Sequence, residues 1–117
     1  MEAPAKGAVV LVRFPFSDLS RTKLRPAVVL ADAGRGDRVL CQVTSKPYSD
    51  PTAVVLEETA FASGSLRVTS YARPGKLFTA SSDLITVEVG ALKREALTRI
   101  VDAVVTLLRA AASGSQP

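Results

Sequence analysis

Histidine is absent from this 117-residue sequence, and cysteine occurs only once, at Cys41. These absences exclude a Ser-His-Asp triad, a Cys-His pair and a zinc site built from His and Cys. A single cysteine cannot form an intramolecular disulfide, which fits a reducing compartment. Because Cys41 lies in an apolar strand pattern, we interpret it as a packed thiol rather than a nucleophile.

Other common features are also missing. There is no Trp, and aromatic residues make up only 5% of the chain, so the core must be built mainly from Val, Leu, Ile and Ala. Neither GxxxxGK[ST] nor GxGxxG occurs, which leaves a glycine-rich phosphate loop without support. No apolar run approaches the roughly 20 residues needed to cross a bilayer. The N-terminal sequence MEAPAKG lacks the apolar stretch of a signal peptide. We therefore expect a cytoplasmic protein without a membrane segment.

The charge of the chain is positive and unevenly distributed. The formal net charge is +4, and residues 1–46 contain eight Lys and Arg against four Asp and Glu. The basic excess therefore lies in the N-terminal part. It fits a polyanionic partner, and it fits equally well a basic surface that is merely solvated.

The hydrophobic pattern predicts short strands followed by one helix. Strands are expected at residues 8–12, 27–31, 38–44, 52–56, 66–71 and 84–89, with an irregular stretch at 57–65 and a short strand or turn at 76–78. From Leu92 to Leu108 the apolar residues recur at helical spacing. The pattern predicts a single domain over residues 1–117, mainly β, with a strongly curved antiparallel sheet or barrel and a C-terminal helix packed on it. Residues 110–117 are expected to be a disordered tail.

The stretch from residue 14 to residue 30, FPFSDLSRTKLRPAVVL, contains the densest set of polar side chains between two apolar strands. Arg25 precedes Pro26, which fixes the backbone just before a buried strand. A guanidinium in such a position matches two phosphate oxygens. The alternative is a surface arginine paired with Asp18, and position alone does not separate the two interpretations.

Two further strand ends carry candidate groups. The hydroxyls of Thr44 and Ser45 could bind a phosphoryl oxygen, or could simply satisfy the turn that follows. Tyr71 and Arg73, in the run SYARP, place an aromatic ring near a cation, which suits stacking on a single-stranded base. Core packing of Tyr71 is the alternative.

Taken together, these stretches resemble the MazF/PemK family of toxins from bacterial toxin–antitoxin pairs. The matching pieces, in family order, are GAVVLVRFPF (7–16), KLRPAVVL (23–30), LCQVTSK (40–46), residues 64–66, SYARPGKL (70–77) and the terminal helix. The resemblance implies a small SH3-like barrel that pairs as a homodimer. It also implies cleavage of single-stranded RNA without a metal or other cofactor, and neutralisation by an acidic antitoxin peptide.

The resemblance also assigns roles to residues. Arg25 and Thr44 match the catalytic pair of the family, with Arg25 neutralising charge on the phosphorane and Thr44 bonding a non-bridging oxygen. The 2′-OH of the RNA would attack the adjacent phosphate and leave a 2′,3′-cyclic phosphate and a 5′-OH. Asp18 or a water molecule is the candidate base. Residues expected to support RNA binding are Phe16, Ser17, Asp18, Lys23, Ser45, Lys46, Ser70, Tyr71 and Arg73.

The sequence departs from the family pattern in two places. The first loop, SDLSRTK, is shorter than in many relatives, and Thr69-Ser70-Tyr71 stands where others carry Arg-x-Asp. Both differences affect RNA recognition and leave the cleaved sequence open. Two other functions remain as alternatives. One is a toxin of the CcdB type that binds a protein such as gyrase, and the other is an RNA-binding module without cleavage.

Overall fold

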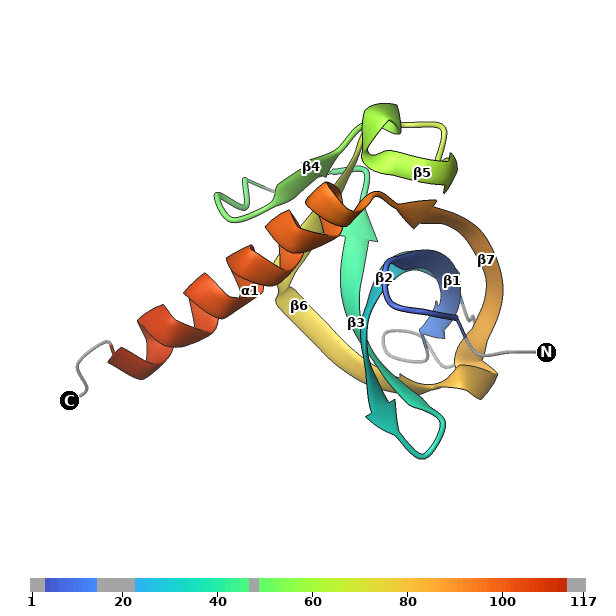
Figure 1. Cartoon of the computed structure of the whole chain (residues 1–117), viewed down its shortest axis with the longest axis horizontal. Coiled ribbons are helices and arrows are strands. Elements are labelled where there is room, and N and C mark those ends of the chain that lie inside the picture. The colour runs from blue at the N-terminus through green and yellow to red at the C-terminus, as the bar shows by residue number, and fades with distance from the viewer. Residues whose placement is uncertain (1–3, 15–22, 47–48, 114–117) are drawn as a thin grey trace.

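The computed structural model describes residues 4–14, 23–46 and 49–113, which form one antiparallel sheet and one long helix (Figure 1). In chain order the elements are β1 (Ala8–Phe14), β2 (Lys23–Gly34), β3 (Asp37–Thr44), β4 (Val54–Leu56), the 3-10 turn η1 (Glu58–Ala60), β5 (Phe61–Gly64), β6 (Ser70–Ser81), the 3-10 turn η2 (Ser82–Leu84), β7 (Ile85–Leu92) and α1 (Arg94–Ser113). The strand order across the sheet is β4-β6-β3-β2-β1-β7-β5. The predicted antiparallel sheet followed by a helix is confirmed.

The sheet is strongly curved because its longest strands bend. Both β2 and β6 contain 12 residues, and the pairing register shifts within β2–β3, β3–β6 and β1–β7. Such shifts bend a strand and increase its twist. Figure 1 shows β7 curving around β1 and β2. The hairpin between β2 and β3 turns at Gly34-Arg35-Gly36, where all three φ angles are positive, a conformation that glycine adopts readily.

Both faces of the central strands are buried, which explains the continuous apolar runs of the sequence. Alternate residues point to opposite faces, so neighbours such as Val28 and Val29 belong to different clusters. Val28, Cys41 and Val43 face the helix. Ala27, Val29 and Leu40 pack on the other face with residues of β1 and β6.

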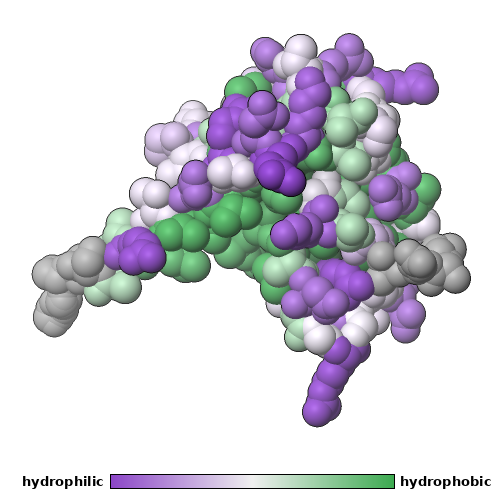
Figure 2. Space-filling view, viewed as in Figure 1, coloured by the Kyte–Doolittle hydropathy of each residue, from purple (hydrophilic) through white to green (hydrophobic). Residues whose placement is uncertain are grey.

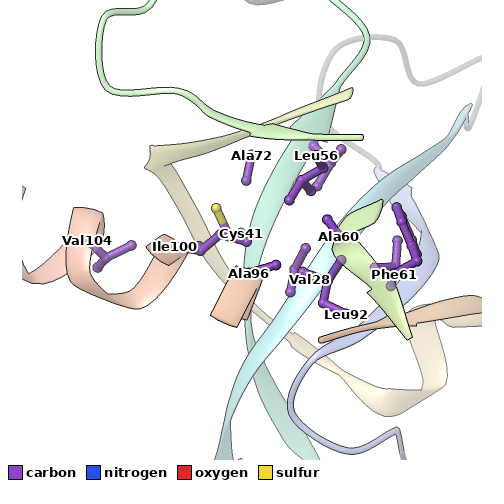
Figure 3. Packing of buried hydrophobic residues seen from close by; sticks show 12 residues of the cluster. Val28, Cys41, Leu56, Ala60, Phe61, Ala72, Leu92, Ala96, Ile100 and Val104 are labelled. Carbon is purple, nitrogen blue, oxygen red and sulfur yellow. The ribbon is translucent and has the colours of Figure 1, made fainter. Parts of the chain in front are cut away.

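Helix α1 closes the first cluster. Ala96, Ile100 and Val104 lie at helical spacing, are buried, and pack with Cys41 and Val28 of the sheet (Figure 3). Burying a side chain the size of Ile100 contributes about 1.5–3 kcal/mol. The helix contacts β6 and β4, and its C-terminal end projects beyond the sheet (Figure 1). Among the described residues, no helix has both the length and the apolar character to span a membrane.

Residues 57–65 were expected to be irregular, and this expectation is wrong for residues 61–64, which form strand β5. Two glycines allow it to form: Gly64 of β5 lies opposite Gly90 of β7. A Cβ at Gly64 would lie 2.1 Å from the carbonyl oxygen of Val89, and φ at Gly64 is +69°. A larger residue would therefore push the two strands apart.

The bounds of strand β6 and the C-terminal end of α1 also differ from those expected. A strand was expected at residues 66–71 and was expected to close at residues 72–75, yet β6 begins only at Ser70 and continues through Pro74. The register against β3 shifts between Ala72 and Leu77, and such an irregularity tolerates a proline, which has no N–H for the ladder. Helix α1 continues to Ser113, four residues into the expected tail, since the run of alanines there favours helix.

Candidate functional site

Arg25 and Thr44 lie near the same end of two neighbouring strands. Arg25 belongs to β2 and pairs with Val12 of β1, whereas Thr44 is the last residue of β3. The β2–β3 ladder pairs Ala27 with Gln42. Continued by two residues, this register predicts that Arg25 lies opposite Thr44 on the same face of the sheet. Residues directly opposite each other in such a pair have Cβ atoms about 4.5–5.5 Å apart.

The row extends beyond Thr44. Thr44 pairs with Tyr71 of β6, and Tyr71 pairs with Val55 of β4. We call Arg25, Thr44, Tyr71 and Val55 the cross-strand row. Because strands are spaced about 4.8 Å apart, the row spans roughly three such spacings. The row lies on the face opposite α1. Val43 and Ala72 face the helix, and their chain neighbours Thr44 and Tyr71 point the other way because side chains alternate along a strand.

The hydroxyl of Thr44 is oriented by its own turn. Its Oγ1 accepts a hydrogen bond from the backbone N–H of Lys46 at 3.1 Å. A hydroxyl that accepts through its oxygen can still donate its hydrogen. Arg25 is exposed and Thr44 is half-buried. Together they can present a permanent positive charge and a hydroxyl donor to an anionic group, as phosphate chemistry requires.

Arg73 lies two residues beyond Tyr71 on the same face of β6, as the alternating burial of residues 70–74 shows. Its Nε donates to Oδ2 of Asp50 at 3.1 Å, and the two side chains retain 21% and 13% exposure. Asp50 also accepts from the hydroxyl and backbone N–H of Thr52. These bonds, led by that of the Thr52 hydroxyl, and the nearby guanidinium hold the pKa of Asp50 below its ordinary value.

The other residues expected at the site are distributed differently. Ser70 is buried on the helix-facing side, where its hydroxyl donates to the Val68 carbonyl at 3.1 Å, so it does not join the row. Ser45 and Lys46 are exposed and directly follow Thr44. Lys23 begins β2, and its backbone pairs with that of Phe14. Phe16, Ser17 and Asp18 lie outside the described residues.

Sequence reasoning missed Asp50. It lies in the segment between β3 and β4, 23 positions before its partner Arg73. The run Asp-Pro-Thr at residues 50–52 is a usable signal, because an Asp side chain often bonds the backbone two residues on. Within the described ranges, no group of three or more Cys, Asp or Glu side chains is placed to hold a metal ion.

Several solved structures have a fold similar to that of this chain. The fold is similar to a crystal structure of MazF from Deinococcus radiodurans, with a TM-score of 0.73 and 21% identity over 93% of this chain and 99% of the other. It is also similar to an endoribonuclease in complex with its cognate antitoxin from a mycobacterial species (TM-score 0.70, 18% identity, 93% and 96% coverage). The Mycobacterium tuberculosis toxin MazF-mt6 gives a TM-score of 0.68 at 13% identity, covering 87% of this chain and 96% of that chain.

A family model identifies the chain more directly than these distant structures, whose low identities establish the fold alone. The model of the PemK-like, MazF-like toxins of type II toxin–antitoxin systems matches residues 5–108. The protein therefore belongs to this toxin family, and the resemblance found in the sequence is confirmed. A search among curated proteins finds no match.

Proposed function

We propose that the protein is an endoribonuclease that cleaves single-stranded RNA without a metal, as the toxin of a toxin–antitoxin pair. The observation that carries the proposal is the cross-strand row. Thr44 pairs with Tyr71, and the β2–β3 register, continued by two residues, is expected to bring Arg25 opposite Thr44. Family membership supports the same reaction. A cytoplasmic location is part of the proposal.

In the proposed reaction the 2′-oxygen of one ribose attacks the adjacent phosphorus while a base removes its proton. The P–O5′ bond breaks, the leaving oxygen takes a proton, and the products are a 2′,3′-cyclic phosphate and a 5′-OH. Arg25 neutralises the charge that develops on the phosphorane, and Thr44 donates to a non-bridging oxygen. An arginine keeps its proton at neutral pH and is therefore a poor base. We propose Asp18 or a water molecule for that step.

Tyr71 and its neighbours complete the proposed RNA surface. Tyr71 is half-buried beside Thr44, and a ring so placed can stack on a base next to the cleaved phosphate, a contact typically worth about 1–3 kcal/mol. Lys23, Ser45, Lys46 and Arg73 supply positive charge and hydrogen-bond donors along the backbone of the RNA. Phe16 and Ser17 are proposed to contribute from the first loop.

To test for this nuclease activity, purified protein is incubated with a long single-stranded RNA in EDTA, and the ends of the products are mapped. Wild type is expected to leave cyclic-phosphate ends, and Arg25→Ala and Thr44→Ala are expected to lose cleavage while remaining folded. Arg35→Ala serves as the matched control, because it removes the same charge at the far end of β2. Binding without cleavage by wild type would contradict the nuclease and favour an RNA-binding module. Neither binding nor cleavage would favour a toxin that acts on a protein.

We further propose a homodimer and an acidic antitoxin segment as partners. Val101, Val105 and Leu108 lie at helical spacing on α1 and stay 36%, 39% and 56% exposed. Figure 2 shows apolar surface along this helix. Apolar surface of this kind supports burial by a second copy. Light scattering on wild type and Val105→Glu tests the dimer, which the substitution is expected to weaken.

The basic excess supports an acidic antitoxin, and similar structures are complexes with antitoxins.

A further inference from the structure

The turn that follows the β3 strand end is held by one carboxylate. Oδ1 of Asp50 accepts from the backbone N–H of Thr52 at 2.9 Å and from its hydroxyl at 2.6 Å. The backbone oxygen of Asp50 accepts from the N–H of Ala53 at 3.2 Å. Ser49, immediately before, has φ at +57°, a conformation that needs support from its surroundings. Asp50 thus fixes the backbone of residues 49–53.

The same carboxylate reaches the sheet. Its Oδ2 accepts from Nε of Arg73 at 3.1 Å, and Arg73 follows Tyr71 on the face that carries the cross-strand row. The backbone of Arg73 is fixed independently, because its carbonyl accepts from the Cys41 thiol at 3.2 Å and the next residue, Pro74, is fully buried. The contact with Asp50 therefore acts on the guanidinium, which it helps to orient.

Asp50 itself is a poor candidate for the chemistry. Both of its carboxylate oxygens already accept hydrogen bonds from Thr52 or Arg73. Those bonds hold its pKa below the ordinary value, and a weakly basic carboxylate removes protons inefficiently near neutral pH. Its role is one of geometry rather than proton transfer.

We propose that Asp50 is a positioning residue, which holds Arg73 on the same face as Tyr71 of the cross-strand row and so builds a subsite for the nucleotide flanking the cleaved phosphate. This inference rests on the proposed function. In it, Arg25 and Thr44 act on the reacting phosphate, whereas Tyr71 and Arg73 receive the neighbouring nucleotide. The subsite determines where the RNA is cut, whereas Arg25 determines the rate of the chemical step.

The test compares Asp50→Asn with Thr52→Val. An asparagine keeps an oxygen for the Thr52 N–H and so preserves the turn, but it loses the charge that holds Arg73. Valine at position 52 removes the hydroxyl bond and leaves the Arg73 ion pair. With a long single-stranded RNA, Asp50→Asn is expected to raise KM about three- to tenfold. It should also broaden the set of cut sites, with kcat changed less than twofold. Thr52→Val is expected to cut like wild type.

A double-mutant cycle separates positioning from general stabilisation. If Asp50 acts through Arg73, Asp50→Asn combined with Arg73→Ala should raise KM no further than Arg73→Ala alone. Additive effects would overturn the inference, and so would equal losses in Asp50→Asn and Thr52→Val that follow their melting temperatures. An Asp50→Asn variant with wild-type KM and cut sites would overturn it as well. Absence of cleavage by wild type would instead contradict the proposed function, so the two failures are distinguishable.

Discussion

The molecule contains two Arg-Pro steps on the same sheet, and they have opposite surroundings. Arg25 precedes the half-buried Pro26 on β2 and is exposed. Arg73 precedes the fully buried Pro74 on β6, retains 21% exposure and is bound to Asp50. The same dipeptide thus gives one guanidinium open to a ligand and one anchored by the protein. The surroundings of the guanidinium, and not the Arg-Pro dipeptide, therefore decide what each arginine can do.

The largest effect is expected at the exposed arginine. Removing a charge stabiliser from a reacting phosphate typically costs on the order of a hundredfold or more in kcat, so Arg25→Ala should reduce RNA cleavage by at least that amount. Its melting temperature should change little, because substitutions at exposed positions usually shift stability by less than about 0.5 kcal/mol. Arg25→Lys should recover only part of the activity, because lysine lacks the planar fork. Equal activity in Arg25→Ala and Arg25→Lys would contradict a role for the planar guanidinium.

The anchored arginine should give the reverse pattern. Arg73→Ala leaves Asp50 without its cation, so it should lower the melting temperature more than Arg25→Ala and reduce kcat far less. Thermal unfolding and steady-state cleavage, measured on the same preparations, test both parts. A hundredfold loss of kcat in Arg73→Ala, with an unchanged melting temperature, would mean that the two steps have equivalent roles.

The ion pair behind Arg73 also predicts a dependence on pH. The pKa of Asp50 lies below its ordinary value of 3.8 in the folded protein, because the bonds to Thr52 and the Arg73 cation favour the charged form. Its contribution to stability should be complete above about pH 5 and be lost as pH falls through the lowered pKa. The difference in melting temperature between wild type and Asp50→Asn should therefore stay constant from pH 5 to 7 and shrink below pH 4. A difference that grows on acidification would have the wrong sign.

The smallest effect concerns the thiol beneath the anchored arginine. Burial raises the pKa of Cys41 to about 12, although a backbone hydrogen bond with Arg73 acts in the opposite direction. At pH 8 the reactive thiolate is therefore scarce. A thiol reagent should label the native protein very slowly and the denatured protein at the ordinary rate. Fast labelling of Cys41 in the native protein would mean that the β6 side of the sheet opens readily.

Much of the fold could be predicted because it depends on local patterns. The Val-rich runs, the hairpin glycines at 34 and 36 and the helical spacing after Leu92 each carry their structure in adjacent residues. The misses have long-range causes. Strand β5 depends on Gly64 meeting Gly90, and β6 passes Pro74 because its register against β3 shifts there. Ser70 is a different case, because a local property, the alternation of side chains along a strand, places it in the core on the face opposite Tyr71.

The amino-acid sequence alone shows which functional groups are available: there is no histidine, the net positive charge lies in residues 1–46, and arginine and hydroxyl groups stand at strand ends. It also determined the family, through motifs spread over most of the chain. Which of those groups lie close together becomes visible only in the folded protein. The pairing of Thr44 with Tyr71, and of Asp50 with Arg73, joins residues 27 and 23 positions apart. Such contacts follow from strand register and sheet curvature, which many residues set together and no single motif encodes.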